Sequence, residues 1–328
     1  MTAASPPWVT MLLIAYNQQS TIAEAIAGAL AQTYSPLEII VSDDASTDAT
    51  WSVMQAAVAD YHGAHQVRVN RNPVNLGIGA HLSHAARIAQ GELLFVAAGD
   101  DVSLPQRCAT VVDAWLAHER RPDLIASALI DIDERGTEHA RIEPARLQDY
   151  ASVADWLARP PHVIGAAQAW TRRLIDRFGP LPQGVVAEDL IMVFRAIGSG
   201  GALTLPDALV RYRRGGISRR VRNLRARDVI ERVLKNNRHA LVEHEQLLRD
   251  AGVMNQLDVV GATLEQKLRR ERYIRDLFGA EGMARKAGLS LRAAGVPGSL
   301  RLRMFFYAAM PWVYAPFFFL KRAASRKS

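Results

Sequence analysis

The sequence predicts an α/β protein whose mostly parallel sheet is covered by helices on both faces. In about the first 120 residues, short apolar runs alternate with segments of helical periodicity, which is typical of parallel strands joined by crossover helices. Three of the apolar runs end in polar pairs, at 16–17, 43–44 and 100–101. Because parallel connections are right-handed, such strand ends meet at one edge of the sheet, where open α/β folds bind ligands.

Four continuous apolar runs predict the strands of this first half. Strands buried on both faces are hydrophobic throughout rather than alternating. The predicted strands are 9–15, 37–42, 67–69 and 92–98.

The segments between these strands predict amphipathic helices. The first helix places Ile22, Ile26 and Leu30 on one face and begins with a Thr21-x-x-Glu24 capping box. The second helix is expected at about 48–60 and is capped by the polar residues 46–48. Two further helices are expected at 81–89 and 104–118.

The middle of the chain, about 120–215, predicts mixed structure. We expect a strand at 124–128, a polar variable loop at 131–150, and a strand or buried turn at 163–170. A helix at 190–197 follows the acidic pair Glu188-Asp189, which the helix dipole would favour as a simple cap. Two further short strands are expected on either side of Pro206-Asp207, at 203–205 and 209–212.

From residue 213 onward the composition changes, and we place a domain boundary near 218. Seven arginines lie between 213 and 227, and helical patterns follow at 224–250 and 257–279. The segment 304–320 is apolar, contains Pro311 and Pro316, and has basic residues on both sides. Its length and prolines favour a segment lying in a membrane interface over a spanning helix. A packed core helix or a dimer contact remains the alternative.

Bulk composition narrows the classes of function. The chain has 328 residues and a formal net charge of +7, which is compatible with nucleic acid, anionic lipid or phosphorylated substrates. A single cysteine, Cys108, excludes an internal disulfide and a multi-cysteine metal site. The N-terminus shows no signal peptide. No glycine-rich phosphate loop follows the first strand, so a metal ion is expected to hold any phosphates.

Five stretches, in their order and spacing, resemble the family 2 glycosyltransferases of bacterial surface-polysaccharide synthesis. They are VTMLLIAYNQQSTIAEAIAGALAQTY, EIIVSDDASTD, NPVNLGIGAHLSHAARIAQGELLFVAAGDDVSLPQR, VVAEDLIM and LVRYRRGGIS. The resemblance implies a GT-A fold over 1–218, with a nucleotide-binding half (1–120) and an acceptor or catalytic half (121–218). The remainder, 219–328, is then a helical, membrane-associating extension.

The resemblance implies the residues of the donor site. In this family the first strand end and the acidic pair after the second strand bind the base and ribose. The corresponding positions here are Ala15, Tyr16, Asn17 and Asp44, with Asp43 beside them.

The aspartate motif after the fourth strand binds ribose and a divalent ion in this family. It corresponds here to Asp100 and Asp101, with Asp101 as the expected metal ligand. The family's pattern is often D-x-D-D, and Ala98 stands here in place of the first aspartate.

The resemblance assigns the catalytic base to Asp189. Glu188 is then a neighbour that orients a loop or the acceptor, unless it only caps the helix. The implied reaction is inverting transfer from a nucleotide sugar, with UDP as the default nucleotide and Mn²⁺ or Mg²⁺ as cofactor. A divalent ion stabilises a leaving diphosphate, and a carboxylate deprotonates an attacking hydroxyl. The arginine-rich string after Tyr212 resembles a loop that closes near the diphosphate.

The expected acceptor is a glycan or a polyprenyl-diphosphate-linked sugar at the cytoplasmic face of a bacterial plasma membrane. The sequence leaves open a homo-oligomer and an inactive nucleotide-binding scaffold in a polysaccharide assembly complex. Nucleic-acid binding rests on charge alone, and the chain lacks the Q-x-x-R-W string of processive synthases. His81, His84 and Arg71 are weaker candidates for contacts to the nucleotide; we expect the histidines to be a polar surface pair.

Overall fold

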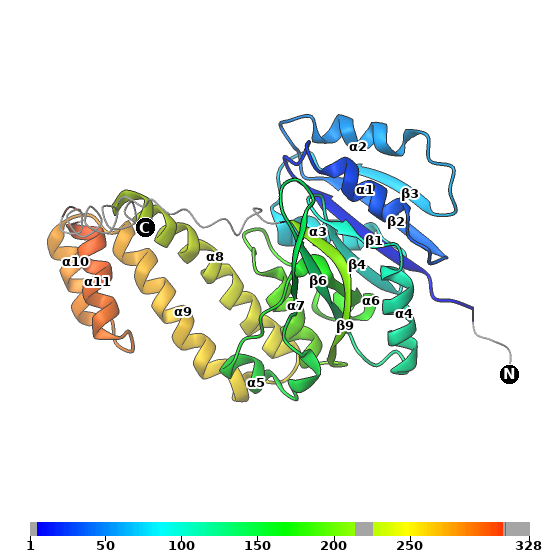
Figure 1. Ribbon diagram of the computed structural model, residues 1–328. Helices are drawn as coiled ribbons and strands as arrows, with labels where there is room; N and C mark the ends of the chain where they lie inside the picture. Colours follow the sequence, from blue (N-terminus) through cyan, green and yellow to red (C-terminus); the bar gives the residue numbers. More distant parts are fainter. Residues whose placement is uncertain (1–4, 214–225, 311, 313–328) are drawn as a thin grey trace. The chain divides into compact units, whose positions relative to one another are not determined.

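The computed structural model describes residues 5–213, 226–310 and 312. The chain divides into two compact units, Met1–Ser218 and Arg219–Ser328. Figure 1 shows the first unit as a sheet flanked by helices and the second as a group of helices. The arginine-rich segment 214–225 lies outside the described residues.

The first half of the sheet is parallel, as the apolar runs predict. Its strands stand in the order β3-β2-β1-β4, and each neighbouring pair is parallel. The strands are β1 (Val9–Ala15), β2 (Leu37–Asp43), β3 (Gln66–Arg71) and β4 (Leu93–Ala98). The helices between and after them are α1 (Ile22–Leu30), α2 (Thr50–Ala59), α3 (Ile78–Ile88) and α4 (Arg107–Ala117).

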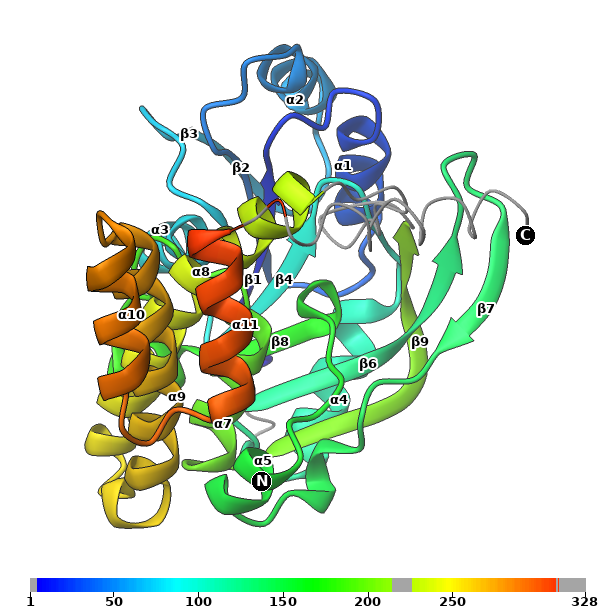
Figure 2. The same ribbon diagram turned by 90° about the vertical axis from the view of Figure 1, so that its left-hand side faces the viewer.

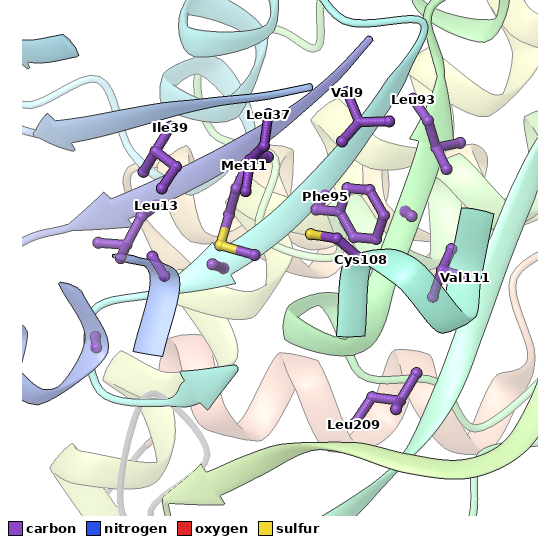
Figure 3. Close-up of a cluster of buried hydrophobic side chains, with 14 of the residues drawn as sticks. Val9, Met11, Leu13, Leu37, Ile39, Leu93, Phe95, Cys108, Val111 and Leu209 are labelled. Atoms are coloured by element: carbon purple, nitrogen blue, oxygen red, sulfur yellow. The ribbon is translucent and has the colours of Figure 1, made fainter. Parts of the chain in front are cut away.

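Side chains from one face of these strands form the main core with α1 and α4. Alternate strand residues point to the same face of a sheet, so every second residue of β1, β2 and β4 enters this layer. Cys108 of α4 is fully buried there, and burial raises the pKa of its thiol to about 12. Figure 3 shows the layer, with these residues labelled: Val9, Met11, Leu13, Leu37, Ile39, Leu93, Phe95, Cys108, Val111 and Leu209.

The second half of the sheet is mixed in direction. It continues from β4 in the order β8-β6-β9-β5; β8 is antiparallel to β4 and to β6, while β9 is parallel to β6. The strands are β5 (Val102–Ser103), β6 (Leu124–Ile132), β7 (Glu138–Ile142), β8 (Gln168–Thr171) and β9 (Ala202–Arg213). The short helices η1 (Leu147–Asp149), η2 (Gly165–Ala167), α5 (Val153–Ala158) and α6 (Arg172–Phe178) and the longer α7 (Glu188–Ile197) connect or flank them.

Three local predictions for the first unit are wrong. The expected loop at 131–150 contains the antiparallel hairpin of β6 and β7. The expected strand pair near 206–207 is the single strand β9, whose pairing with β6 shifts register there. A shift of this kind accommodates the proline, which cannot donate to the ladder.

The third error concerns the start of α1. Thr21 makes no side-chain cap of that helix; its hydroxyl donates instead to the Gly99 carbonyl at 2.8 Å. A complete capping box does occur in the first unit, between Ser152 and Asp155 at the start of α5.

The second unit contains four described helices. They are α8 (Ala226–Val253), α9 (Leu257–Gly279), α10 (Met283–Arg292) and α11 (Gly298–Ala309). The long helices α8 and α9 lie side by side, and α10 and α11 pack near the end of α9 (Figures 1 and 2). The core here joins Tyr273, Ile274 and Leu277 of α9 to Leu300 and Met304 of α11.

Among the residues that the structure describes, no helix combines the length and the apolar character needed to cross a bilayer. The apolar segment expected in the membrane interface, 304–320, begins within α11. Residues 311 and 313–320 of that segment lie outside the described part of the chain.

Candidate active site

The three polar strand ends meet at one edge of the sheet. The backbone N–H of Asp44 donates to the Ala15 carbonyl, and that of Gly99 donates to the Ile14 carbonyl, each at 2.9 Å. The end of β1 therefore joins the end of β2 on one side to the end of β4 on the other. The structure thus brings the residues expected to bind nucleotide and metal to one place.

Asp43 is engaged by its own surroundings. It is fully buried and accepts hydrogen bonds from the Ser46 N–H, and its Oδ2 lies 3.1 Å from Arg71 Nε. Arg71 also donates to the Ser46 carbonyl and lies over the Trp51 ring, 5.4 Å from its centroid. Arg71, a candidate for a nucleotide contact, thus holds the loop after β2 in place.

Asp44 organises the loop that leads into α3. Only 2 % of it is exposed, and its Oδ1 accepts from Asn72 Nδ2 at 2.8 Å and from the Leu76 N–H at 2.9 Å. Its Oδ2 accepts from the Gly77 N–H at 2.9 Å. Gly77 has φ +77°, a conformation that favours glycine. Both oxygens of Asp44 therefore hold the backbone of 72–77 in place.

Asn17 ties β1 to the loop after β2, whereas Tyr16 presents a free ring. Asn17 Oδ1 accepts from the Thr47 N–H, and the Asn17 N–H donates to Ser46 Oγ, both at 2.9 Å. The Tyr16 side chain is 46 % exposed at the same edge. A ring in this position offers an apolar face on which a nucleotide base can stack.

A buried polar chain lies beneath this edge and corrects our expectation for His81. This histidine is 2 % exposed, and its Nε2 lies 2.7 Å from Ser42 Oγ. Ser42 Oγ also accepts from Asn70 Nδ2 at 2.8 Å, and Asn70 reaches Asn72. Burial lowers the pKa of His81 to about 4, so the ring is neutral at pH 7 and shares one hydrogen bond with the Ser42 hydroxyl.

His84, in contrast, lies on the partly exposed side of α3, where its Nδ1 accepts from Arg87 at 3.1 Å. The two histidines are therefore not a surface pair. Two residues three positions apart on a helix can lie on either side of the boundary between its buried and exposed faces, and the spacing alone does not show where that boundary falls.

Asp100 and Asp101 form a second acidic pair with a different environment. Asp101 is 5 % exposed, and its Oδ1 accepts from the Arg213 N–H at 2.8 Å. Burial, followed by the charge of Asp100, raises the pKa of Asp101 well above its usual range, against the opposing charges of Arg107 and Arg213. Burial also raises the pKa of Asp100. The two carboxylates are thus adjacent at the sheet edge, with Asp101 buried and Asp100 partly exposed.

Two buried arginines lie beside this pair: Arg107, which no sequence pattern indicated, and Arg213, which was expected in a loop near the diphosphate and ends β9 instead. Arg213 Nε donates to the Asp100 carbonyl at 3.0 Å, and its other nitrogens bind Glu24 of α1 and the Asp133 carbonyl. Arg107 is 1 % exposed and donates to Val96 of β4 at 2.8 Å. Burial lowers the pKa of Arg107 to about 10.

The donor set at Asp100 and Asp101 suits a hard divalent ion that is shared with a ligand. In the described part of the chain, no group of three or more His, Cys, Asp or Glu side chains could hold an ion. Mg²⁺ and Mn²⁺ take oxygen ligands, and Mg²⁺ is commonly held by one or two carboxylates together with substrate phosphates and water. Two adjacent carboxylates, which repel each other unless a cation joins them, fit that arrangement.

Glu188 and Asp189 occupy the first turn of α7. Glu188 is 4 % exposed, whereas Asp189 is partly exposed and its Oδ1 accepts from the Leu190 N–H at 2.8 Å. Gly165 packs against this pair, since an added Cβ there would lie 2.7 Å from Glu188 Oε1. Gln168 of β8 donates to the Asp189 carbonyl at 3.4 Å.

Gln168 connects α7 to the region of Asp100 and Asp101. Its backbone carbonyl accepts from Arg107 at 3.3 Å, and β8 pairs with β4, the strand that comes just before Asp100 in the chain. On the other side, Gly79 of α3 packs against Val185, with the Gly79 N–H 3.4 Å from the Val185 carbonyl. One site is therefore bordered by Asp100 and Asp101, by the loop that Asp44 holds, and by the start of α7.

Comparison with known proteins gives a family match. Residues 10–175, more than half of the chain, match the model of glycosyl transferase family 2. EpsE of Bacillus subtilis is 33% identical over 141 residues, which are 43% of this chain and 50% of EpsE. The succinoglycan biosynthesis protein ExoU of Rhizobium meliloti is 37% identical over 147 residues, which are 44% of this chain and 40% of ExoU. The matched part thus spans half or less of these relatives.

Solved structures share the fold. S. aureus TarS 1-349 in complex with UDP-GlcNAc superposes with a TM-score of 0.53 at 16% identity, covering 98% of this chain and 92% of that one. The mannosyltransferase PcManGT from Pyrobaculum calidifontis, in complex with GDP-Man and Mn²⁺, gives 0.53 at 19% identity, covering 94% and 87%. The predicted GT-A type of fold, with helices after it, is confirmed.

Proposed function

The chain belongs to glycosyl transferase family 2, and from this premise we propose that it transfers a sugar, with inversion, from a nucleotide diphosphate sugar to a hydroxyl of a glycan. One observation carries the proposal. The adjacent carboxylates Asp100 and Asp101, of which Asp101 is buried, stand at the sheet edge between the strand ends at Tyr16 and the start of α7.

On the donor side, Asp101 is the proposed metal ligand and Asp100 contacts the ribose. A divalent ion bound there would supply Lewis-acid stabilisation of the leaving diphosphate. Ala15, Tyr16 and Asn17 border the base, with the Tyr16 ring as its stacking surface. The contacts of Asp43 and Asp44 within the protein support an indirect role for both: they hold the loops that enclose the nucleotide.

On the acceptor side, Asp189 is the proposed general base. A carboxylate at the start of α7 is stabilised by the helix dipole. It takes the proton of the attacking hydroxyl as the new glycosidic bond forms, while the nucleotide diphosphate leaves with the bonding electrons. A single base with one direct displacement gives inversion without a covalent intermediate. Glu188, buried against Gly165, keeps the start of α7 in position.

We propose a UDP-sugar as donor and Mn²⁺ or Mg²⁺ as cofactor. The complexes of TarS with UDP-GlcNAc and of PcManGT with GDP-Man and Mn²⁺ support a nucleotide sugar and a divalent ion for this fold. The name of ExoU supports polysaccharide biosynthesis as the process.

The proposed acceptor is a polyprenyl-diphosphate-linked glycan at the cytoplasmic face of a bacterial plasma membrane. The support is the basic and apolar composition of the region after 218, which suits an anionic membrane surface. In this proposal 1–218 is the transferase domain and 219–328 associates with the membrane.

The test combines nucleotide selection with transfer. Thermal shifts with UDP, GDP and dTDP, each with and without Mn²⁺, identify the nucleotide, and NMR of the product then gives its anomeric configuration. Replacement Asp189→Asn should lower kcat by 10²- to 10⁴-fold, as for loss of a general base. The exposed aspartate of α6 provides the control Asp176→Asn, which should keep full activity. Retention of the donor configuration, or full activity without the Asp189 carboxylate, would overturn the mechanism.

A further inference from the structure

An apolar groove lies between α10 and α11 in the second unit. It has a volume of about 330 Å³, and its lining includes Leu291 of α10 and Leu302 and Phe305 of α11. Leu291 is 81 % exposed and Leu302 is 60 % exposed. Two leucines this exposed on one groove form an apolar surface that is suited to a partner.

These leucines are separate from the core that holds the helices together. The opposite face of α11, with Leu300 and Met304, packs against α9, whereas no residue of α10 is buried. Arg301 Nη1 donates to the Ser290 carbonyl at 3.1 Å, which joins the end of α10 to α11. The groove is therefore built into a fixed helical hairpin, which we call the α10–α11 hairpin (283–309).

The charge of this hairpin has one sign. Residues 283–309 include five basic residues and no acidic residue: Arg285, Lys286, Arg292, Arg301 and Arg303. An arginine directly follows each of the two exposed leucines. Arginine and lysine side chains are long enough to bind anionic groups while neighbouring apolar side chains enter a less polar layer.

We propose that the α10–α11 hairpin docks on an anionic phospholipid bilayer, with Leu291 and Leu302 inserted at the level of the acyl chains. The exposed cations Arg285, Arg292 and Arg303 then contact headgroup phosphates, as in other basic, apolar interfacial helices, whereas Lys286 and Arg301 donate to backbone carbonyls within the hairpin. A second copy of the chain fits less well, because two such faces would bring like charges together. The proposal rests on the membrane location proposed above and is independent of the transfer reaction.

The experiment measures vesicle binding by the full chain. Vesicles contain either phosphatidylcholine alone or phosphatidylcholine mixed with phosphatidylglycerol, and flotation gives the bound fraction. The chain should bind the mixed vesicles and dissociate at high salt. The double variant Leu291→Glu/Leu302→Glu should lose binding, and Arg303→Gln should weaken it about fivefold, since each cation near the surface contributes about 1 kcal/mol.

A matched control is Leu257→Glu, at a leucine that is 49 % exposed at the start of α9. This variant should bind vesicles as the unchanged chain does, and circular dichroism should show equal helix content in all variants. Equal vesicle binding by the double variant, or no binding by the unchanged chain, would overturn the proposal. So would a double variant whose main change is from dimer to monomer in light scattering.

Nucleotide binding separates this outcome from the proposed reaction. The double variant should show the same thermal shift with nucleotide and Mn²⁺ as the unchanged chain. If neither binds nucleotide while the vesicle results hold, the reaction is wrong and the membrane surface stands.

Discussion

Two Asp-Asp pairs lie at one edge of the sheet, at the ends of the strands on either side of β1, yet their surroundings differ. Asp43 and Asp44 accept from backbone N–H groups and from Arg71, so their oxygens are engaged within the protein. Asp100 and Asp101 repel each other in a buried site, and the pKa of each is raised. The same dipeptide therefore organises a loop in one place and forms the proposed cation site in the other.

The largest expected effect comes from Asp101→Asn, which removes one charge of the cation site. The amide keeps an acceptor for the Arg213 N–H but loses the charge that would hold a divalent ion. We expect kcat to fall by about a thousandfold, equivalent to about 4 kcal/mol of transition-state stabilisation. Because a buried, mutually repelling charge is removed, the Tm of the metal-free protein should rise. A Tm below that of the unchanged chain would contradict this view of the pair.

The opposite result is expected for Asp44→Asn. An amide cannot accept from the donors on both sides of this side chain, so at least one of the Leu76 and Gly77 N–H groups loses its partner. The free energy of unfolding should fall by about 3 kcal/mol, the upper end for an unsatisfied buried donor. Urea denaturation measures it. Unchanged stability in this variant would remove the distinction between the two pairs.

These contrasts show what the sequence can and cannot reveal. The continuous apolar runs predicted β1, β2 and β4 to within a residue, because strands buried on both faces have no polar interruption. They also placed the three polar strand ends together. Hairpin strand β7 was missed because its residues are mostly exposed and charged, so no period of burial marks it.

Of the arginines beside the site, Arg107 was not expected from the sequence, and Arg213 was expected in a loop near the diphosphate rather than at the end of a strand. Arg107 and Arg213 are buried, and a buried arginine is recognisable only when its carbonyl and carboxylate partners are known. Those partners come from strands and helices far away in the sequence. Glu24 likewise suggested a local cap, whereas it pairs with Arg213, 189 residues further along.

A smaller effect is a dependence of folding stability on pH that comes from His81, which is buried beneath the loop held by Asp44. Since the pKa of His81 is about 4 in the folded protein and about 6.5 in the unfolded chain, the unfolded state binds more protons between these values. Stability is therefore highest above about pH 6.5 and falls as the pH drops toward 4, by about 2 kcal/mol between pH 6.5 and 5.

Denaturation at several pH values, with His81→Gln and His84→Gln, measures this dependence. The loss of stability should shrink in His81→Gln and remain in His84→Gln, whose histidine lies on the partly exposed side of α3. If the pH dependence of stability were the same in His81→Gln as in the unchanged chain, His81 would not be its source.

The smallest effect is expected for Gly165→Ala, which disturbs the third acidic pair and leaves the other two intact. The new methyl group would lie 2.7 Å from Glu188 Oε1, so the Glu188 side chain must shift. We expect kcat to fall about fivefold, or about 1 kcal/mol, with unchanged nucleotide binding. Gly288→Ala is the control, because a Cβ there meets nothing within 4 Å. Weakened nucleotide binding in Gly165→Ala would place Glu188 in the donor site instead.

The central claim is that Asp100 and Asp101 are the cation-dependent part of the nucleotide site. Calorimetric titration with UDP, in the presence and absence of Mn²⁺, tests it most directly on the unchanged chain and on Asp101→Asn. We predict that Mn²⁺ strengthens UDP binding at least tenfold in the unchanged chain and has no effect in the variant. Equal strengthening by Mn²⁺ in both proteins would contradict the claim.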